Sequence, residues 1–384
     1  MKTIHRLTSV ASFNRSVMLV LLSVPIIATV VLSSVLWEAF DRGFSGPPLS
    51  GLLVSKVIPF LNRCLFPWAK QFVIHDDDAF AVTAAIAYGV GVPILFLLCA
   101  ASAPSSVFVA FVYNVIRIGP YFMNFAYVYT LCHKEGHRHP LWKDPSWRGV
   151  FNKWIGLFYG IVPENFAIGH SYIHHKYNNG PEDVTTTRDT NRDSAYNFWR
   201  YLWRMMLYCS NISVIYSLVH KRRFDLAATA FLGSVQYTLV LIAASLAVHP
   251  KFMVMYLLYP FFESVVMLAA INWCWHAFID PDDPDNPHVA SLTITSGPIN
   301  VLNENYHVAH HAQPGRHWAK VQETQHRLDD DPRHATGSTF KNTHVFELFV
   351  LILCKDYEGL AARHAGGCSP STLRKRLRFV PPTA

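Results

Sequence analysis

Long apolar stretches dominate the pattern of hydrophobic and polar positions along this 384-residue chain. They cover residues 17–36, 80–103, 105–131, 225–248 and 252–275. Each approaches or exceeds the ~20 residues that a helix needs to cross a ~30 Å hydrocarbon layer. The short polar segment "APSS" separates the second stretch from the third, and "HPK" separates the fourth from the fifth. The pattern therefore predicts two transmembrane helical hairpins, which make four core spans, with 17–36 as a further candidate span.

Composition and charge support this interpretation and orient the spans. The chain is 51% hydrophobic and 15% charged, which is typical of an integral membrane protein. The polar segments 132–223 and 276–384 carry most of the 33 Lys and Arg residues. By the positive-inside rule both segments lie on the cytoplasmic side, so the net charge of +7 is largely a topology signal. No nucleic-acid-binding motif accompanies the basic residues, and nucleic acid is not expected as a partner.

These patterns predict an all-α integral membrane fold whose cytoplasmic segments form a helical cap. Residues 1–74 are a membrane or interfacial region, in which 51–74 is amphipathic. Residues 75–345 form the main domain, and residues 346–384 are a cytoplasmic tail. The basic stretch "LRKRLRF" in this tail is a candidate contact for anionic lipid. The seven scattered cysteines show no paired spacing and are predicted to be reduced.

Histidines gather just beyond the ends of the apolar stretches, in "HKEGH", "HSYIHH", "NWCWH" and "HVAHH". Several are four residues apart, about one helical turn, so their side chains share a helix face. One such pair alone is more often a cap, a packing element or a surface feature. Nine imidazoles converging on one side of the membrane would repel each other if protonated, and would be poorly satisfied if neutral and unbonded. Metal binding removes both problems, and nine donors exceed what one ion can use, so two ions are predicted.

The donor type narrows the choice of metal without deciding it. No set of cysteines with ligand spacing occurs, which excludes a cysteine-rich structural zinc site. Imidazole suits iron, copper, zinc and nickel.

The motifs together resemble the membrane fatty acid desaturase and hydroxylase superfamily of di-iron enzymes. "HKEGH" matches a first histidine box of the type H-x-x-G-H, and "HVAHH" matches the third box of acyl-lipid desaturases. The Asn-x-x-x-His of "NWCWH" is similar to a further ligand segment of stearoyl-type desaturases. The resemblance covers roughly residues 75–345 and implies two Fe²⁺ ions, with no catalytic residues beyond their ligands. The implied ligands are His133, His137, His170, His174, His175, His276, His307, His310 and His311, with Asn272 acting through a water and His139 in reserve.

The resemblance implies that O₂, activated at the two irons, removes hydrogen from an unactivated C–H bond of a fatty acyl or lipid chain. A desaturase is favoured by the third box, and a hydroxylase of the same superfamily is the alternative. "HSYIHH" keeps the alternative open, because it has three residues before its histidine pair, as in alkane monooxygenases, where acyl-lipid desaturases have two. A histidine-lined metal transporter is disfavoured, since its ligands would lie near the bilayer midplane and not past the helix ends.

The sequence also indicates which partners the site needs. No heme, dinucleotide or iron–sulfur motif occurs, so a separate donor of the cytochrome b5, ferredoxin or rubredoxin type is expected to supply electrons. The expected location is the endoplasmic reticulum or the bacterial inner membrane, with the active site facing the cytoplasm.

Ligand histidines need an acceptor for their second ring nitrogen, and nearby acids are candidates. Of these, Glu182 and Asp183 follow the turn "NNGP" and are expected to be ordinary helix-flanking acids. The full set of candidates is Glu135, Glu164, Glu182, Asp183 and Glu304.

Overall fold

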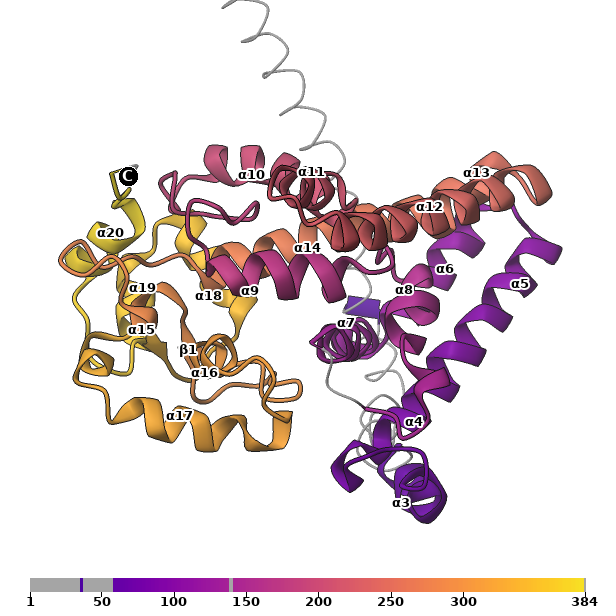
Figure 1. The fold of residues 1–384 in the computed structure, drawn as a ribbon, viewed down its shortest axis with the longest axis horizontal. Coiled ribbons are helices and arrows are strands. Elements are labelled where there is room, and N and C mark those ends of the chain that lie inside the picture. The colour runs from indigo at the N-terminus through magenta and orange to yellow at the C-terminus, as the bar shows by residue number, and fades with distance from the viewer. Residues whose placement is uncertain (1–34, 37–57, 138–140, 383–384) are drawn as a thin grey trace, which may run out of the picture. The chain divides into compact units, whose positions relative to one another are not determined.

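The computed structural model describes residues 35–36, 58–137 and 141–382. The predictions for 17–34 and 51–57, and for His139, lie outside the described residues. The chain divides into two compact units that interleave along the sequence (Figure 1). Among the described residues, unit 1 comprises 169–217 and 265–382, and unit 2 comprises 35–36, 58–137, 141–168 and 218–264.

Unit 2 holds most of the apolar helices. Among the described residues, three helices are long and apolar enough to cross a membrane: Asp76–Ser102, Phe224–Ala247 and Pro250–Trp275, of which the last continues into unit 1. They coincide with three of the predicted stretches, so the chain is a mostly helical membrane protein. The pairing of spans into membrane hairpins stays a prediction. The helices are α3 (Ile58–Ala69), α4 (Ala79–Ile86), α5 (Val92–Ser102), α6 (Val107–Ile118), α7 (Met123–Gly136), α8 (Gly156–Phe158), α12 (Phe224–Ala247), α13 (Pro250–Met253) and α14 (Tyr259–Trp275), with π-helical turns at η3 (Ala87–Gly91), η6 (Val150–Ile155) and η8 (Val254–Leu258).

The stretch 105–131 is not the straight helix that its apolar run predicts. Helices α6 and α7 meet at a bend of 61°. Gly119 ends α6 with φ 77°, a conformation that side chains disfavour, and Pro120 follows it. A Cβ at Gly119 would lie 2.3 Å from Cγ of Asn124, so the bend requires glycine at this position. A hydropathy profile does not detect such a bend, because it reports how apolar a stretch is and not the direction of its backbone.

A charged pair is buried inside unit 2. Arg117 on α6 forms an ion pair with Glu263 on α14, and both side chains are almost fully buried. Nε and Nη2 of Arg117 also donate to Oδ1 of Asn114, at 3.2 and 3.0 Å. Tyr159 donates from its hydroxyl to the carbonyl oxygen of Arg117 at 3.1 Å. This polar cluster joins α6 to α14 within the apolar part of the unit.

Unit 1 contains a core in which the end of α14 packs with the C-terminal helices. Buried residues of this core include Phe278, Phe340, Leu348 and Leu377. The parallel strands β1 (Thr293–Ile294) and β2 (Thr339–Phe340) pair beside it. Residues from the predicted tail 346–384 therefore contribute to a packed core. Besides the end of α14, the helices wholly or partly in unit 1 are α9 (His175–Tyr177), α10 (Ala195–Cys209), α11 (Ile212–His220), α15 (Pro287–Ala290), α16 (His307–Ala312), α17 (Val321–Asp329), α18 (Val345–Cys354), α19 (Tyr357–Arg363) and α20 (Pro370–Arg378).

Candidate metal centre

Four of the predicted ligands converge inside unit 1. His174 ends the π-helix η7 (Asn165–His174), His276 follows α14, and His307 and His311 lie one turn apart on α16. One ring nitrogen from each lies within 4.8 Å of those of the others. Nε2 of His307 is 3.3 Å from Nε2 of His276 and 3.1 Å from Nε2 of His311. We call these residues the four-histidine group.

The orientation of the rings in the four-histidine group suits a metal ion. Nδ1 of His276 is 2.9 Å from the carbonyl oxygen of Ala290, and Nδ1 of His174 is 2.8 Å from Oδ2 of Asp183. Both acceptors require a proton on Nδ1, which leaves the Nε2 lone pairs for a ligand. Two nitrogens bound to one ion at ~2.1 Å lie roughly 3.0–3.4 Å apart, and the Nε2 separations above fall in this range.

The electrostatics of the four-histidine group favour the neutral form of His276 and His311, which is the form that binds a metal ion. Burial, and then the neighbouring His174, lower the pKa of His276 to about 3. Burial also lowers the pKa of His311 well below its ordinary value, and the surrounding histidines lower it further. Protons are therefore disfavoured at the positions where a cation would bind.

Asp183 holds His174 in place, contrary to the expectation that it is a helix-flanking acid. Its buried carboxylate accepts from Nδ1 of His174, and also from the backbone N–H and hydroxyl of Thr185 at 2.8 and 2.7 Å. The backbone N–H of Asn179 donates to it at 3.1 Å. Burial raises the pKa of Asp183, but His174 and Thr185 lower it to a net value below the ordinary one. The expectation failed because the turn that carries Asp183 folds back onto the histidine nine residues earlier.

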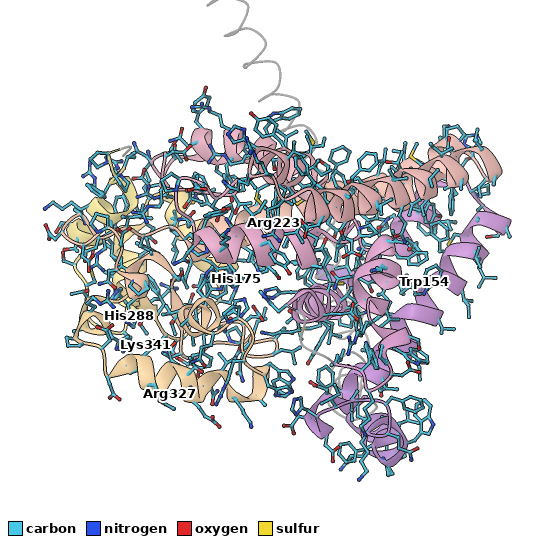
Figure 2. The ribbon with its side chains drawn as sticks, viewed as in Figure 1. Trp154, His175, Arg223, His288, Arg327 and Lys341 are labelled. Carbon is cyan, nitrogen blue, oxygen red and sulfur yellow. The ribbon has the colours of Figure 1, made fainter. Side chains whose placement is uncertain are left out.

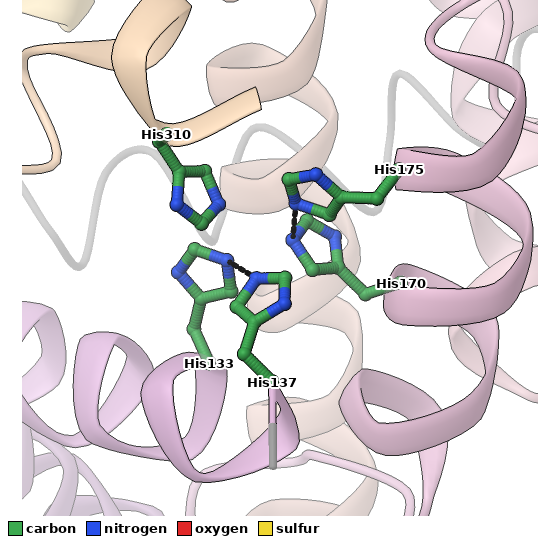
Figure 3. A group of neighbouring side chains, drawn as sticks. All are labelled: His133, His137, His170, His175 and His310. Atoms are coloured by element: carbon green, nitrogen blue, oxygen red, sulfur yellow. Dashed lines mark hydrogen bonds between the residues drawn. The ribbon is translucent and has the colours of Figure 1, made fainter. Parts of the chain in front are cut away.

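The spacing in "HSYIHH" predicts that His170 and His174 share a helix face, and their rings are stacked with centroids 5.1 Å apart. Because η7 is a π-helix, with hydrogen bonds between residues five apart, His170 also faces His175. Their Nε2 atoms are 2.9 Å apart (Figure 3), and His174 lies in the four-histidine group. The extra residue of this box therefore matches a π-helical turn.

His310 joins His170 and His175 to form a second cluster in unit 1. The ring centroid of His310 is 4.6 Å from that of His175 and 6.2 Å from that of His170. His310 lies on α16 between the two residues that α16 contributes to the four-histidine group. This short helix therefore contributes histidines to both clusters.

His133 and His137 form a separate pair in unit 2. They lie one turn apart at the end of α7, as the spacing predicts, and their Nε2 atoms are 2.8 Å apart (Figure 3). Gly136, which lies between them in the sequence, allows close packing against Phe166. A Cβ at Gly136 would lie 2.7 Å from Cβ of Phe166 and 2.9 Å from its carbonyl carbon. The glycine of the box thus permits α7 to approach the start of η7.

Glu135 and Glu164 have partners other than histidines in the described contacts. The carboxylate of Glu135 accepts from the backbone N–H groups of Gly149, Phe151 and Asn152, at 2.9, 3.1 and 2.9 Å. Glu135 therefore holds the loop that follows α7. Glu164 forms an ion pair with Lys153 at 2.7 Å.

Asn272 lies on α14 one turn before His276. Its Nδ2 donates to the hydroxyl of Tyr201 at 2.6 Å and to the carbonyl oxygen of Thr185 at 3.3 Å. A role through a bound water would therefore use its Oδ1 and stays a prediction.

Comparison with known proteins gives one finding. A family model described as "Fatty acid desaturase" matches residues 106–341, a range that includes every predicted ligand. No curated protein and no solved structure matches the chain.

Proposed function

Because the chain belongs to the fatty acid desaturase family and is a membrane oxidoreductase, we propose that it uses O₂ to oxidise unactivated C–H bonds of a fatty acyl or lipid chain. The observation that carries this proposal is the four-histidine group, whose ring nitrogens converge and in which hydrogen bonds orient His174 and His276. Desaturation is the favoured outcome, as the third histidine box indicates.

We assign two iron ions to the histidines. One would be held by His174, His276, His307 and His311. The second is assigned His170, His175 and His310 of unit 1, and the family resemblance implies that His133 and His137 of unit 2 are also iron ligands. When bound, the pair supplies the dioxygen chemistry that side chains alone cannot perform.

The chain's own residues position these ligands. The Asp183 carboxylate and the Ala290 carbonyl oxygen fix the tautomers of His174 and His276, so both present Nε2. The π-helical turn of η7 places Nε2 of His170 2.9 Å from Nε2 of His175, while the adjacent His174 is held by Asp183. Such placement decides which C–H bond is reached, since small displacements change rates strongly.

Hydroxylation is the alternative, and the spacing of "HSYIHH" is the specific observation that favours it. We further propose that a separate donor of the cytochrome b5, ferredoxin or rubredoxin type supplies the electrons. The active site is proposed to face the cytoplasm, in the endoplasmic reticulum or the bacterial inner membrane.

Product analysis tests this proposal. The full chain is expressed in a host membrane, and the acyl chains are analysed by mass spectrometry under ¹⁸O₂. Loss of two hydrogens without label identifies a desaturase, and a gain of one labelled oxygen identifies a hydroxylase. The His311→Ala variant should form neither product, whereas the His326→Gln variant, which changes an exposed histidine outside both clusters, should behave like the wild type.

Metal analysis separates the proposal from the transporter hypothesis. The purified protein should contain about two irons per chain. Unchanged acyl chains combined with metal uptake into vesicles that contain the protein would contradict the enzymatic proposal.

A further inference from the structure

Helix α20 presents a basic stripe on its exposed face. Positions spaced i, i+3, i+4 and i+7 project from the same side of a helix. The opposite face is anchored, because Leu373 and Leu377 are fully buried in the core of unit 1. The exposed residues at this spacing, which we call the α20 stripe, are Ser371, Arg374, Lys375 and Arg378.

The α20 stripe borders an open cavity of about 360 Å³ at the protein surface. Its other lining residues are Pro281 and Phe379, so apolar surface lies beside the cations. A cavity of this kind suits a ligand with a negative charge next to an apolar part.

Most of the positive charge on the α20 stripe lacks a protein counter-charge. Among the described residues, neither Arg374 nor Lys375 forms an ion pair. Arg378 donates from Nε to Oδ2 of Asp193 at 2.5 Å. Like charges three or four residues apart on a helix repel each other, so the positive charges of the stripe destabilise the helix when no anion is bound. A bound anion would relieve this repulsion.

The surroundings of the α20 stripe within unit 1 indicate the kind of anion. Asp193, the partner of Arg378, lies two residues before α10. Tyr196, the second residue of α10 and three residues after Asp193, is also exposed. Exposed aromatic side chains on short helices are typical of the membrane–water interface, where they lie at the level of the lipid head groups.

We propose that the α20 stripe and its cavity bind the phosphate of an anionic phospholipid head group. The cations contact the phosphate, and Phe379 and Pro281 contact the apolar part of the lipid. The apolar lining beside the charges, together with the exposed Tyr196 close to the Asp193 partner of Arg378, favours a lipid over an acidic protein. The proposal rests on the chain being a membrane protein and does not depend on the reaction that the metal centre performs.

A lipid titration of the full-length protein, purified in a neutral detergent, tests the proposal. Short-chain phosphatidylglycerol should raise the Tm saturably, whereas phosphatidylcholine of the same chain length should have little effect. Each basic residue near an anionic surface contributes about 1 kcal/mol, so R374Q/K375Q should raise the half-saturating lipid concentration by roughly tenfold or more. R374K/K375R keeps both charges and should respond like the wild type.

The control variant K320Q/K341Q removes two other exposed positive charges of unit 1; Lys341 is labelled in Figure 2. It should keep the wild-type response. Equal responses of wild type and R374Q/K375Q would overturn the proposal, as would an equal loss in K320Q/K341Q, which would indicate unspecific attraction. A response to inorganic phosphate as strong as that to phosphatidylglycerol would overturn the assignment to a lipid.

Discussion

The carboxylate of Asp183 lies 2.8 Å from Nδ1 of His174, and both side chains are buried. Three further donors, from Thr185 and Asn179, hold the carboxylate in position. A carboxylate that binds the outer nitrogen of a ligand histidine fixes the tautomer of the ring and strengthens its binding to metal. The loop that carries Asp183 therefore fixes the orientation of the His174 ring and leaves its Nε2 free of a proton.

Replacing this acid should weaken metal binding without unfolding the protein. The Asp183→Asn variant keeps the shape but can direct an amide N–H at His174, which disfavours the required tautomer. We expect metal affinity or activity to fall roughly 10- to 100-fold. Iron content after dialysis against a chelator measures the effect. Glu182→Gln changes the exposed neighbouring acid and should retain its metal; equal metal loss in both variants would contradict the assignment.

Removing one partner of the buried ion pair of Arg117 and Glu263 should lower the stability of the protein. Glu263→Gln leaves the guanidinium of Arg117 buried without its counter-charge, a change that typically costs about 3–5 kcal/mol. The midpoint of thermal unfolding in detergent should fall accordingly. The double variant R117M/E263M replaces both charges by apolar groups and should recover most of the loss. A double variant no more stable than Glu263→Gln would show that packing, and not the unpaired charge, dominates.

Gly136 should tolerate no side chain. Gly136→Ala places a Cβ 2.7 Å from Cβ of Phe166, so α7 must move away from η7. Overpacking of this kind typically costs about 1–3 kcal/mol, and we expect lower thermal stability together with lower activity. Gly91→Ala is the matched control, because a Cβ at Gly91 meets no atom within 4 Å. If Gly91→Ala were as damaging, loss of chain flexibility rather than the close contact would be the cause.

His364 should contribute to the dependence of stability on pH. Burial, and then the charge of Arg376, lower its pKa to about 4, from an ordinary value of 6.5. Between these values the unfolded chain binds more protons than the folded one. Its contribution is therefore complete above about pH 6.5 and is lost as the pH falls towards 4.

The Tm of the wild type should consequently fall more steeply below pH 6.5 than that of the His364→Gln variant. Thermal unfolding from pH 7.5 to pH 4.5 gives the two slopes, and the effect should amount to a few degrees. His326→Gln, which changes an exposed histidine, should follow the wild-type slope. Parallel curves for wild type and His364→Gln would contradict the assignment.

Much of the helical scaffold could be predicted from hydropathy alone. The stretches 80–103, 225–248 and 252–275 each coincide with a helix long enough to span a membrane. A run of about 20 consecutive apolar residues can be recognised as a candidate span without information from the rest of the chain. The bend within 105–131 could not be predicted this way, because it depends on how Gly119 packs against Asn124.

The sequence by itself determined which histidines are candidate metal ligands, because imidazole chemistry and helical spacing are local properties. His307 and His311, and likewise His133 and His137, pair as a single α-helical turn requires. Only the tertiary structure decided how "HSYIHH" is used. Its π-helical turn pairs His170 with His175 and directs His174 to a different group, next to Asp183. That choice depends on the hydrogen bonds that the backbone forms and on a loop folding back onto the helix, and neither is encoded in the spacing of the histidines.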